Sequence, residues 1–156
     1  MNAIEFREIS LINLDEIIDL QVRPDQVNLV ADNLYSIAQA SLDSSGWCRA
    51  AYLDDKPVGF FFVKELEGGT LAYICRFMID QRWQGQGIGR RIMNQLLDLL
   101  FSSPSVGAVD LAVSRDSGGA EEFYRKCGFS PTGEPYRGGW RMVLHRPDYH
   151  SKIHAK

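Results

Sequence analysis

The segment from Thr70 to Phe101 constrains the fold of this chain more than any other, because three backbone patterns follow one another in it. Residues 71–79 form an apolar run rich in aromatic and branched side chains, which predicts a buried strand. The sequence QGQGIG, residues 84–89, comes next and opens onto apolar residues at helical spacing. The segment therefore predicts a strand, a glycine-rich turn and the start of a helix.

A junction of this kind favours the binding of an anion. The first N–H groups of a helix have no acceptor within the helix and carry a partial positive charge. Glycine has no Cβ, so a phosphate can approach the backbone closely. The spacing differs from GxGxxG and from GxxxxGK[ST], and a plain strand–helix turn is the alternative interpretation. We expect the anion at these residues: Gln84, Gly85, Gln86, Gly87, Ile88, Gly89 and Arg90.

Length and charge limit the class of protein. A chain of 156 residues fits one domain, which we place at residues 1–145, followed by a polar and mobile tail at 146–156. A net charge of −3 gives no nucleic-acid footprint, so we expect no nucleic-acid partner. No apolar run approaches the roughly 20 residues of a membrane span, so we expect no membrane partner.

The cysteines and histidines indicate compartment and metal content. Cys48, Cys75 and Cys127 are odd in number and widely spaced, which favours reduced thiols in the cytoplasm over disulfides or zinc. The three histidines lie in the last twelve residues, a poor place for a metal site. We therefore expect no metal.

The rest of the chain predicts a mixture of strands and helices. Including the two elements above, we expect seven strands and four helices. The strands lie near residues 4–9, 47–53, 58–66, 71–79, 106–113, 129–132 and 140–144, and the helices near 14–20, 25–42, 89–101 and 117–127. DDKP at 54–57 and the glycine pair at 68–69 read as turns, and GEPYRGG at 133–139 as a hairpin loop. Gly128 suits the left-handed residue after the last helix.

Two motifs in this order resemble those of the GNAT family of N-acetyltransferases. The first is a glutamine followed by two glycines after a long strand: Gln84, Gly87 and Gly89. The second is a helix with alanine, an aromatic pair and then Gly-Phe: Ala120, Phe123, Tyr124, Gly128 and Phe129. The expected order of strands and helices also agrees with the family over residues 4–144. Within the family, residues 26–40 and RFMID at 76–80 are similar to the spermine/spermidine acetyltransferase branch.

The resemblance implies a fold and a cofactor. The fold is of the α/β (α+β) class, with a mixed, mostly antiparallel sheet of about seven strands, about four helices and a V-shaped split between the central strands. Acetyl-CoA is the implied co-substrate, with its pyrophosphate at Gln84–Arg90 and its pantetheine arm along Phe77, Met78 and Ile79. Ser117 is implied to contact the same arm, where relatives often have the longer asparagine. The resemblance is compatible with a homodimer.

The resemblance also implies a reaction, the transfer of acetyl to a primary amine by direct attack. Tyr124 is the implied general acid, which protonates the departing thiolate. An alkylamine of pKa about 10.4 must lose a proton first, so a base is needed. Several polyamine-acetylating relatives have a carboxylate where this chain has Cys75, which leaves Asp80, Glu134 or a chain of waters as the base. Cys75 as a nucleophile is the less favoured reading, since a strand cysteine is usually a small buried hydrophobe.

The acceptor is expected to be a small amine, and a polyamine such as spermidine or spermine fits the resemblance. Gln26, Asn33 and Tyr35 are candidate acceptor-binding residues, and Asp25 and Asp32 are candidates for a cation. An amino acid, an aminoglycoside or a peptide or protein amine is an alternative acceptor. A non-catalytic acyl-CoA sensor is the alternative without turnover.

Overall fold

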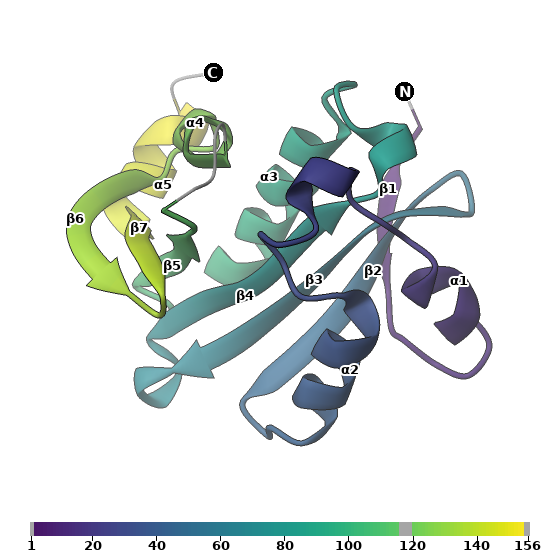
Figure 1. Ribbon diagram of the computed structural model, residues 1–156. Helices are drawn as coiled ribbons and strands as arrows, with labels where there is room; N and C mark the ends of the chain where they lie inside the picture. The colour runs from purple at the N-terminus through teal and green to yellow at the C-terminus, as the bar shows by residue number, and fades with distance from the viewer. Residues whose placement is uncertain (1, 116–119, 155–156) are drawn as a thin grey trace. The chain divides into compact units, whose positions relative to one another are not determined.

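The computed structural model describes residues 2–115 and 120–154. Its strands form one mixed sheet in the order β1-β2-β3-β4-β5-β7-β6 (Figure 1). The strands are β1 Ile4–Arg7, β2 Gly46–Leu53, β3 Lys56–Leu66, β4 Leu71–Ile79, β5 Ala108–Val113, β6 Ser130–Tyr136 and β7 Gly139–His145. The helices are α1 Leu14–Ile18, α2 Asn33–Ser41, α3 Ile88–Phe101, α4 Ala120–Lys126 and α5 Arg146–His154, with 3₁₀ turns at Pro24–Gln26, Glu67–Gly69 and Gln81–Trp83.

The pairing confirms the expected sheet. β4 and β5 are parallel, whereas the β1–β2, β2–β3, β5–β7 and β6–β7 pairs are antiparallel. The β4–β5 register covers three residues at the start of β4, Leu71–Tyr73. The fold is therefore the mixed, open seven-stranded α/β arrangement predicted from the sequence.

The described chain divides into two compact units. The first contains the residues up to Lys64 together with Cys75–Ile92, and the second contains Glu65–Ile74 together with the residues from Met93 onward. The glycine-rich loop lies in the first unit and Tyr124 in the second.

The core of the first unit lies between its strands and the helices α1 and α2. It is a cluster of buried side chains from α1, β2, β3, β4 and the turn after α1, and it includes aromatic rings from β2 and β3: Ile17, Leu20, Ala50, Tyr52, Phe60, Phe62 and Met78. The turn between β2 and β3 has positive φ at Asp54 (50°) and Asp55 (62°), which matches the twist of an antiparallel hairpin. Met78 brings β4 into this core, so the strand that precedes the glycine-rich loop is fixed by apolar packing.

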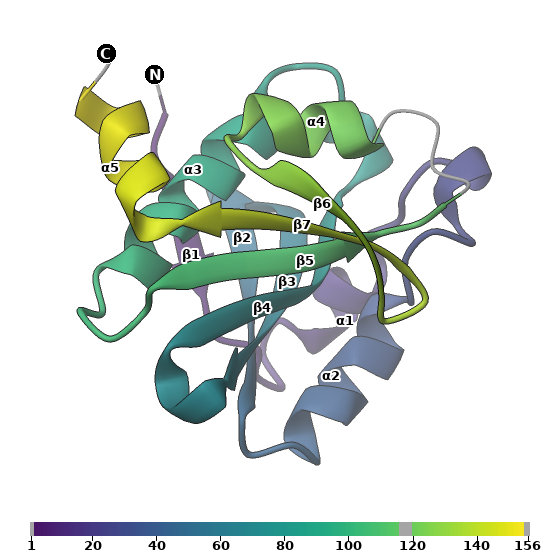
Figure 2. The ribbon, with the colours of Figure 1, turned by 90° about the vertical axis from the view of Figure 1, so that its left-hand side faces the viewer.

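The second unit is built on β5, β7 and β6, with α4 beside them and α5 following β7 (Figure 2). Inward-facing residues of β5 and β7, such as Leu111 and Met142, are buried. The end of α4 is marked by Gly128 at φ 108°, as expected for a left-handed residue after a helix. In this unit the sheet therefore has a buried face, and Gly128 defines where α4 ends.

Three expectations for local structure were wrong. The expected helix at 25–42 is a 3₁₀ turn at Pro24–Gln26 followed by α2, which begins only at Asn33. The Asp32 carboxylate accepts the N–H of Tyr35 at 2.7 Å, and this N-cap fixes the start of α2. The expected hairpin loop at 133–139 is mostly strand, because β6 continues to Tyr136 and the turn needs only Arg137 and Gly138, both with positive φ.

The third correction concerns the expected mobile tail, of which Arg146–His154 form the helix α5. Arg146 donates to the carbonyls of Val106 (2.8 Å), Ser103 (2.7 Å) and Phe101 (3.2 Å). Tyr149 is buried, stacks on Phe101 with ring centroids 4.5 Å apart, and shares a hydrogen bond with Asp98. α5 is therefore held by tertiary contacts that its polar sequence does not reveal. Among the described residues, no helix is both long and apolar enough to span a membrane.

We predict that Gly139→Ala destabilises the second unit. A Cβ at Gly139 would lie 2.1 Å from the carbonyl oxygen of Val113, a backbone atom that cannot rotate away. Overpacking of this kind typically costs about 1–3 kcal/mol in the free energy of unfolding. Chemical denaturation measures this loss, and Gly107→Ala is the matched control because its Cβ would meet only Thr70 O at 3.8 Å. Equal stability of the two variants would contradict the prediction.

Candidate active site

Asp80 fixes the start of the glycine-rich loop. It is 2% exposed and caps the 3₁₀ turn at Gln81–Trp83. One carboxylate oxygen accepts the backbone N–H (3.0 Å) and Nε (2.8 Å) of Arg82, and the other accepts the N–H of Gln21 (3.0 Å). Burial alone would raise the pKa of Asp80, but these hydrogen bonds outweigh it and lower the pKa. Asp80 is therefore an ionised structural cap, and the structure favours this role over that of a base.

Gln84 ties the loop to two other segments. Its side-chain Nε2 donates to the carbonyl of Ile79 at 2.8 Å and to Oε1 of Gln26 at 3.0 Å. Gln26 Oε1 also accepts the N–H of Arg23 at 3.1 Å. Gln26, expected to bind the acceptor, is thus engaged in positioning Gln84. The amide of Gln84 holds the first residue of the loop against the end of β4.

The glycines of the loop supply an unusual backbone conformation. Gly85 and Gly87 have φ values of 76° and 78°, in the left-handed region that L side chains rarely adopt. A Cβ on either would meet no atom within 4 Å, so the conformation, and not crowding within this unit, requires glycine. The N–H of Arg91 bonds to the carbonyl of Gly87 at 3.2 Å, so the helical bonding of α3 begins there. The N–H groups of residues 88–90 are then left without an intrahelical acceptor, which is the arrangement that binds phosphate.

The two arginines after the loop differ in their surroundings. Arg90 is exposed. Arg91 is partly buried and donates to the carbonyl of Asn2 at 2.5 Å. Arg90 is thus the residue of this pair that lies open to a phosphate.

The strand before the loop carries the residues expected along the pantetheine arm. Met78 and Ile79 are buried, and Phe77 is partly buried. A Cβ on Gly59 of β3 would lie 2.8 Å from Met78 O and 3.1 Å from Ile79 Cδ1, so glycine is needed for the close approach of β3 at this point. The side chains of Met78 and Ile79 serve the core, and the carbonyl of Ile79 accepts Gln84 Nε2, so the other backbone groups of this segment are the part that can meet a ligand.

Tyr124 lies on α4 of the second unit and is partly buried. Its ring makes edge contacts with Phe123 and Phe129, with centroids 5.2 Å and 6.0 Å away. None of the hydrogen bonds among the described residues uses its hydroxyl. Burial, with a smaller contribution from Cys127, raises the pKa of Tyr124 well above its usual value. The phenol is therefore protonated throughout the neutral range and can act as a donor. Ser117, expected to contact the pantetheine arm, lies outside the described residues.

Cys75 packs at the edge of the apolar cluster of the first unit, together with Cys48. Two effects raise the pKa of the Cys48 thiol to about 12: burial, which is the larger, and the nearby Cys75. The thiol of Cys48 is therefore not ionised at neutral pH. Glu134 lies exposed on β6 of the second unit, where its N–H donates to Thr132 Oγ1 at 3.1 Å. The apolar surroundings of Cys75 agree with its reading as a small hydrophobe.

The remaining acceptor candidates lie in different environments. Asn33 is 3% exposed, and its side chain donates to the carbonyl of Ile17 at 2.8 Å, so it serves packing at the start of α2. Tyr35 is 58% exposed. Asp25 is exposed and pairs with Arg23 at 3.4 Å, whereas Asp32 is the N-cap of α2. Of the three candidates for binding the acceptor, Gln26, Asn33 and Tyr35, it is thus Tyr35 whose side chain is exposed.

Sequence reasoning missed Arg76, the residue after Cys75. Its Nη1 donates to the carbonyl of Cys75 at 2.9 Å and its Nη2 to Oε1 of Gln39 at 3.2 Å, while its Nε is buried without a hydrogen-bond partner. An arginine on a half-buried strand was hidden in a stretch that reads as apolar. The sequence feature that could have pointed to Arg76 is a positively charged residue within an otherwise apolar strand.

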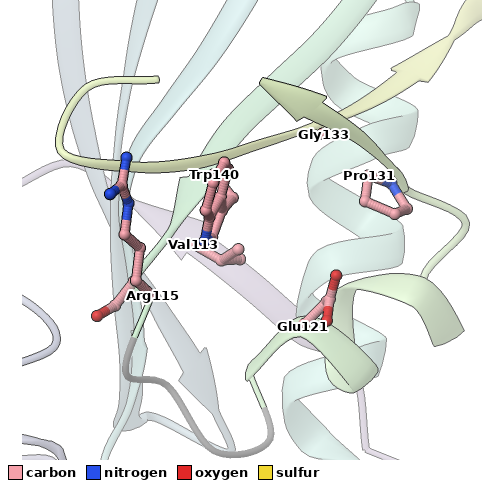
Figure 3. Close-up of a pocket in the computed structure, with 7 residues that line it drawn as sticks. Val113, Arg115, Glu121, Pro131, Gly133 and Trp140 are labelled. Atoms are coloured by element: carbon pink, nitrogen blue, oxygen red, sulfur yellow. The ribbon is translucent and has the colours of Figure 1, made fainter. Parts of the chain in front are cut away.

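The second unit also contains a pocket of about 400 Å³ (Figure 3). The guanidinium of Arg115 lies over the ring of Trp140, 4.5 Å from its centroid, and Glu121 of α4 also faces the pocket. Its lining is completed by Val113, Ser114, Pro131 and Gly133. None of the residues predicted to bind ligand lines it.

We predict that Asp80→Asn lowers stability at neutral pH by about 1–3 kcal/mol, the usual cost of removing a buried hydrogen-bonded partner. Because the folded-state pKa of Asp80 is lowered, its contribution is complete above the unfolded value of about 4 and is lost as pH falls through the folded value. Denaturation at several pH values should therefore show a shallower acid loss in the variant. Asp55→Asn, at a side chain 87% exposed, is the control. Identical acid profiles for wild type and Asp80→Asn would contradict this account.

Comparison with known proteins places the site in context. A model of the acetyltransferase (GNAT) family matches residues 14–129. Spermine/spermidine N(1)-acetyltransferase of Bacillus subtilis is 22% identical over 157 residues, covering 91% of this chain and 97% of that protein. An aminoglycoside acetyltransferase in complex with coenzyme A is 18% identical, with a TM-score of 0.82 and coverage of 97% and 99%. Spermidine N-acetyltransferase from Vibrio cholerae, in complex with CoA and spermine, is 19% identical, with a TM-score of 0.73 and coverage of 94% and 98%.

Proposed function

Because this chain belongs to the GNAT family of acetyltransferases, we propose that it transfers acetyl from acetyl-CoA to the primary amine of a small molecule. The observation that carries the proposal is the family match over residues 14–129. The glycine-rich loop between β4 and α3 supports it independently, because its backbone has the conformation that receives a phosphate. The odd number and wide spacing of the cysteines favour a cytoplasmic enzyme.

We assign the pyrophosphate and the pantetheine arm of acetyl-CoA to different segments of the chain. The pyrophosphate would bind the N–H groups at the start of α3, with Gln84, Gly85, Gln86, Gly87 and Arg90 shaping the loop. The pantetheine arm would lie along the backbone of Phe77–Ile79, and Ser117 is proposed to contact the same arm. The side chains of Met78 and Ile79 support this role by anchoring the strand in the core.

Tyr124 is the proposed general acid. In the reaction the amine nitrogen forms a bond to the acetyl carbon, the carbon–sulfur bond breaks, and the leaving thiolate receives a proton from the phenol. The raised pKa of Tyr124 keeps that proton available. A phenol of high pKa need not transfer its proton fully, because a hydrogen bond to the developing thiolate also stabilises the transition state. The ammonium acceptor loses one proton to water before the attack, and the second proton that its nitrogen loses as the amide forms returns to the phenolate of Tyr124 and restores the general acid.

The proposed acceptor is an alkylamine, of which polyamines such as spermidine and spermine are the representatives suggested by the relatives. Tyr35 is proposed as a contact, since it is exposed on α2. Aminoglycosides belong in the same comparison, because an aminoglycoside acetyltransferase is among the similar structures.

The test is a thiol-release assay with acetyl-CoA and a panel of polyamines, amino acids, aminoglycosides and peptides. We expect release of CoA that depends on an amine, with saturation in both substrates. Stabilisation by acetyl-CoA at 100 times its Kd would add about 2.7 kcal/mol to the free energy of unfolding. Stabilisation without turnover of any amine would instead indicate an acyl-CoA sensor, and absence of both effects would contradict the proposal.

A further inference from the structure

The guanidinium of Arg76 has an unusual environment for a charged group on a central strand. Arg76 is partly buried on β4, next to the segment Phe77–Ile79. Its two hydrogen bonds go to neutral oxygens, the carbonyl of Cys75 and the amide of Gln39. Its Nε is buried and has no hydrogen-bond partner. Among the described residues, the hydrogen-bond partners of this charge are therefore neutral dipoles.

No ion pair joins Arg76 to a carboxylate in the part of the chain that the structure describes, residues 2–115 and 120–154. The contrast with other arginines is clear, because Arg7, Arg82 and Arg141 each lie within 3.0 Å of a carboxylate oxygen. Removing a guanidinium from water without an anion has a cost, and a donor left unpaired adds to it. A bound anion would offset the cost of the uncompensated charge.

We propose that Arg76 binds a carboxylate of the acceptor, so that the substrate is an alkylamine that also carries a carboxylate, such as a diamino acid. This inference rests on the proposed acetyl transfer and narrows its acceptor. The guanidinium has five N–H donors, of which two are used by Cys75 O and Gln39 Oε1. Each Nη atom thus has one N–H left, and this pair suits the two oxygens of one carboxylate.

The neighbours of Arg76 support an anionic over a polycationic ligand. The side chain that contacts the guanidinium from another element is Gln39 of α2, which is neutral. A bare polyamine would therefore bring further positive charge to an uncompensated arginine, whereas an amine with a carboxylate would neutralise it.

The experiment compares acceptors that differ only in the carboxylate: lysine with cadaverine, and ornithine with putrescine. We expect wild-type kcat/KM to favour the amino acid of each pair by about tenfold to hundredfold, the range for hydrogen bonds to a charged group. In Arg76→Gln the preference should fall to near unity through a higher KM for the amino acid, with the KM for acetyl-CoA unchanged. Arg76→Lys should retain part of the preference, because it keeps the charge and loses the fork of donors.

Arg49→Gln is the control for loss of an arginine in the same unit, since Arg49 lies over Trp47 and pairs with Glu8 at 3.6 Å. It should leave the acceptor preference unchanged.

Calorimetry of the same four amines with CoA-loaded protein separates the two proposals. A carboxylate preference in binding without turnover would support the role of Arg76 and contradict acetyl transfer. Turnover of cadaverine or spermidine above lysine and ornithine, or a preference that survives Arg76→Gln, would overturn the role of Arg76.

Discussion

Tyr124→Phe is expected to lower kcat by about tenfold to a thousandfold, within or just below the usual range for removal of a general acid. The substitution removes one oxygen and leaves the ring that contacts Phe123 and Phe129. Stability should therefore change little, and the KM for acetyl-CoA should stay near the wild-type value. Steady-state kinetics with saturating substrates measure the effect.

The pH dependence sharpens this prediction. Burial raises the pKa of Tyr124, so the phenol stays protonated through the neutral and mildly alkaline range. The wild-type rate should therefore rise with pH as the amine loses its proton, with no decline from Tyr124 in that range. Tyr149→Phe is the control, because it removes a phenol of the same unit that bonds to Asp98. Wild-type turnover in Tyr124→Phe would remove Tyr124 from the mechanism.

Gly87→Val is expected to weaken acetyl-CoA binding by about tenfold or more. Gly87 has a φ of 78°, in the left-handed region. A residue with a Cβ is destabilised there by about 1–2 kcal/mol, and β-branched residues such as valine are rarely found in this conformation. The loop must then either keep the strain or move its N–H groups away from the phosphate position. Titration calorimetry with acetyl-CoA gives the change in Kd directly.

The control for Gly87→Val is Gly138→Val in the β6–β7 turn. Gly138 has a similar φ of 83°, and a Cβ there would also meet no atom within 4 Å. Both variants carry the same kind of backbone strain, and only Gly87 lies in the proposed phosphate loop. Equal weakening of acetyl-CoA binding in the two variants would show that general destabilisation, and not the loop, causes the loss.

Much of the fold follows from local patterns in the sequence. The strand, loop and helix around the glycines were predicted because apolar periodicity and glycine spacing act over a few residues. The start of α2 was missed because Asp32 looked like a surface acid, whereas its side chain caps Tyr35 N. The helix α5 was missed because its stability comes from Arg146 and Tyr149, which bind residues some 40 to 50 positions earlier.

The candidate site was predictable in its cofactor part and less so in its acceptor part. The loop is a contiguous motif, so its residues could be read from the sequence. The bond between Gln84 and Gln26 joins residues 58 positions apart, and no spacing rule reveals it. Likewise, the uncompensated charge of Arg76 depends on Gln39 from another element. Tertiary neighbours thus decide which polar residues are structural and which have donors left for a ligand.

The measurement that tests acetyl transfer most directly is mass spectrometry of both the acceptor and the intact protein during one reaction with acetyl-CoA and a responsive amine. Direct attack predicts one acetylated amine for each CoA released, with the mass of the protein unchanged at every time point. An acetylated protein that forms and decays at the rate of turnover would contradict direct attack and implicate a nucleophile such as Cys75. Release of CoA without any acetylated amine would contradict the proposed function itself.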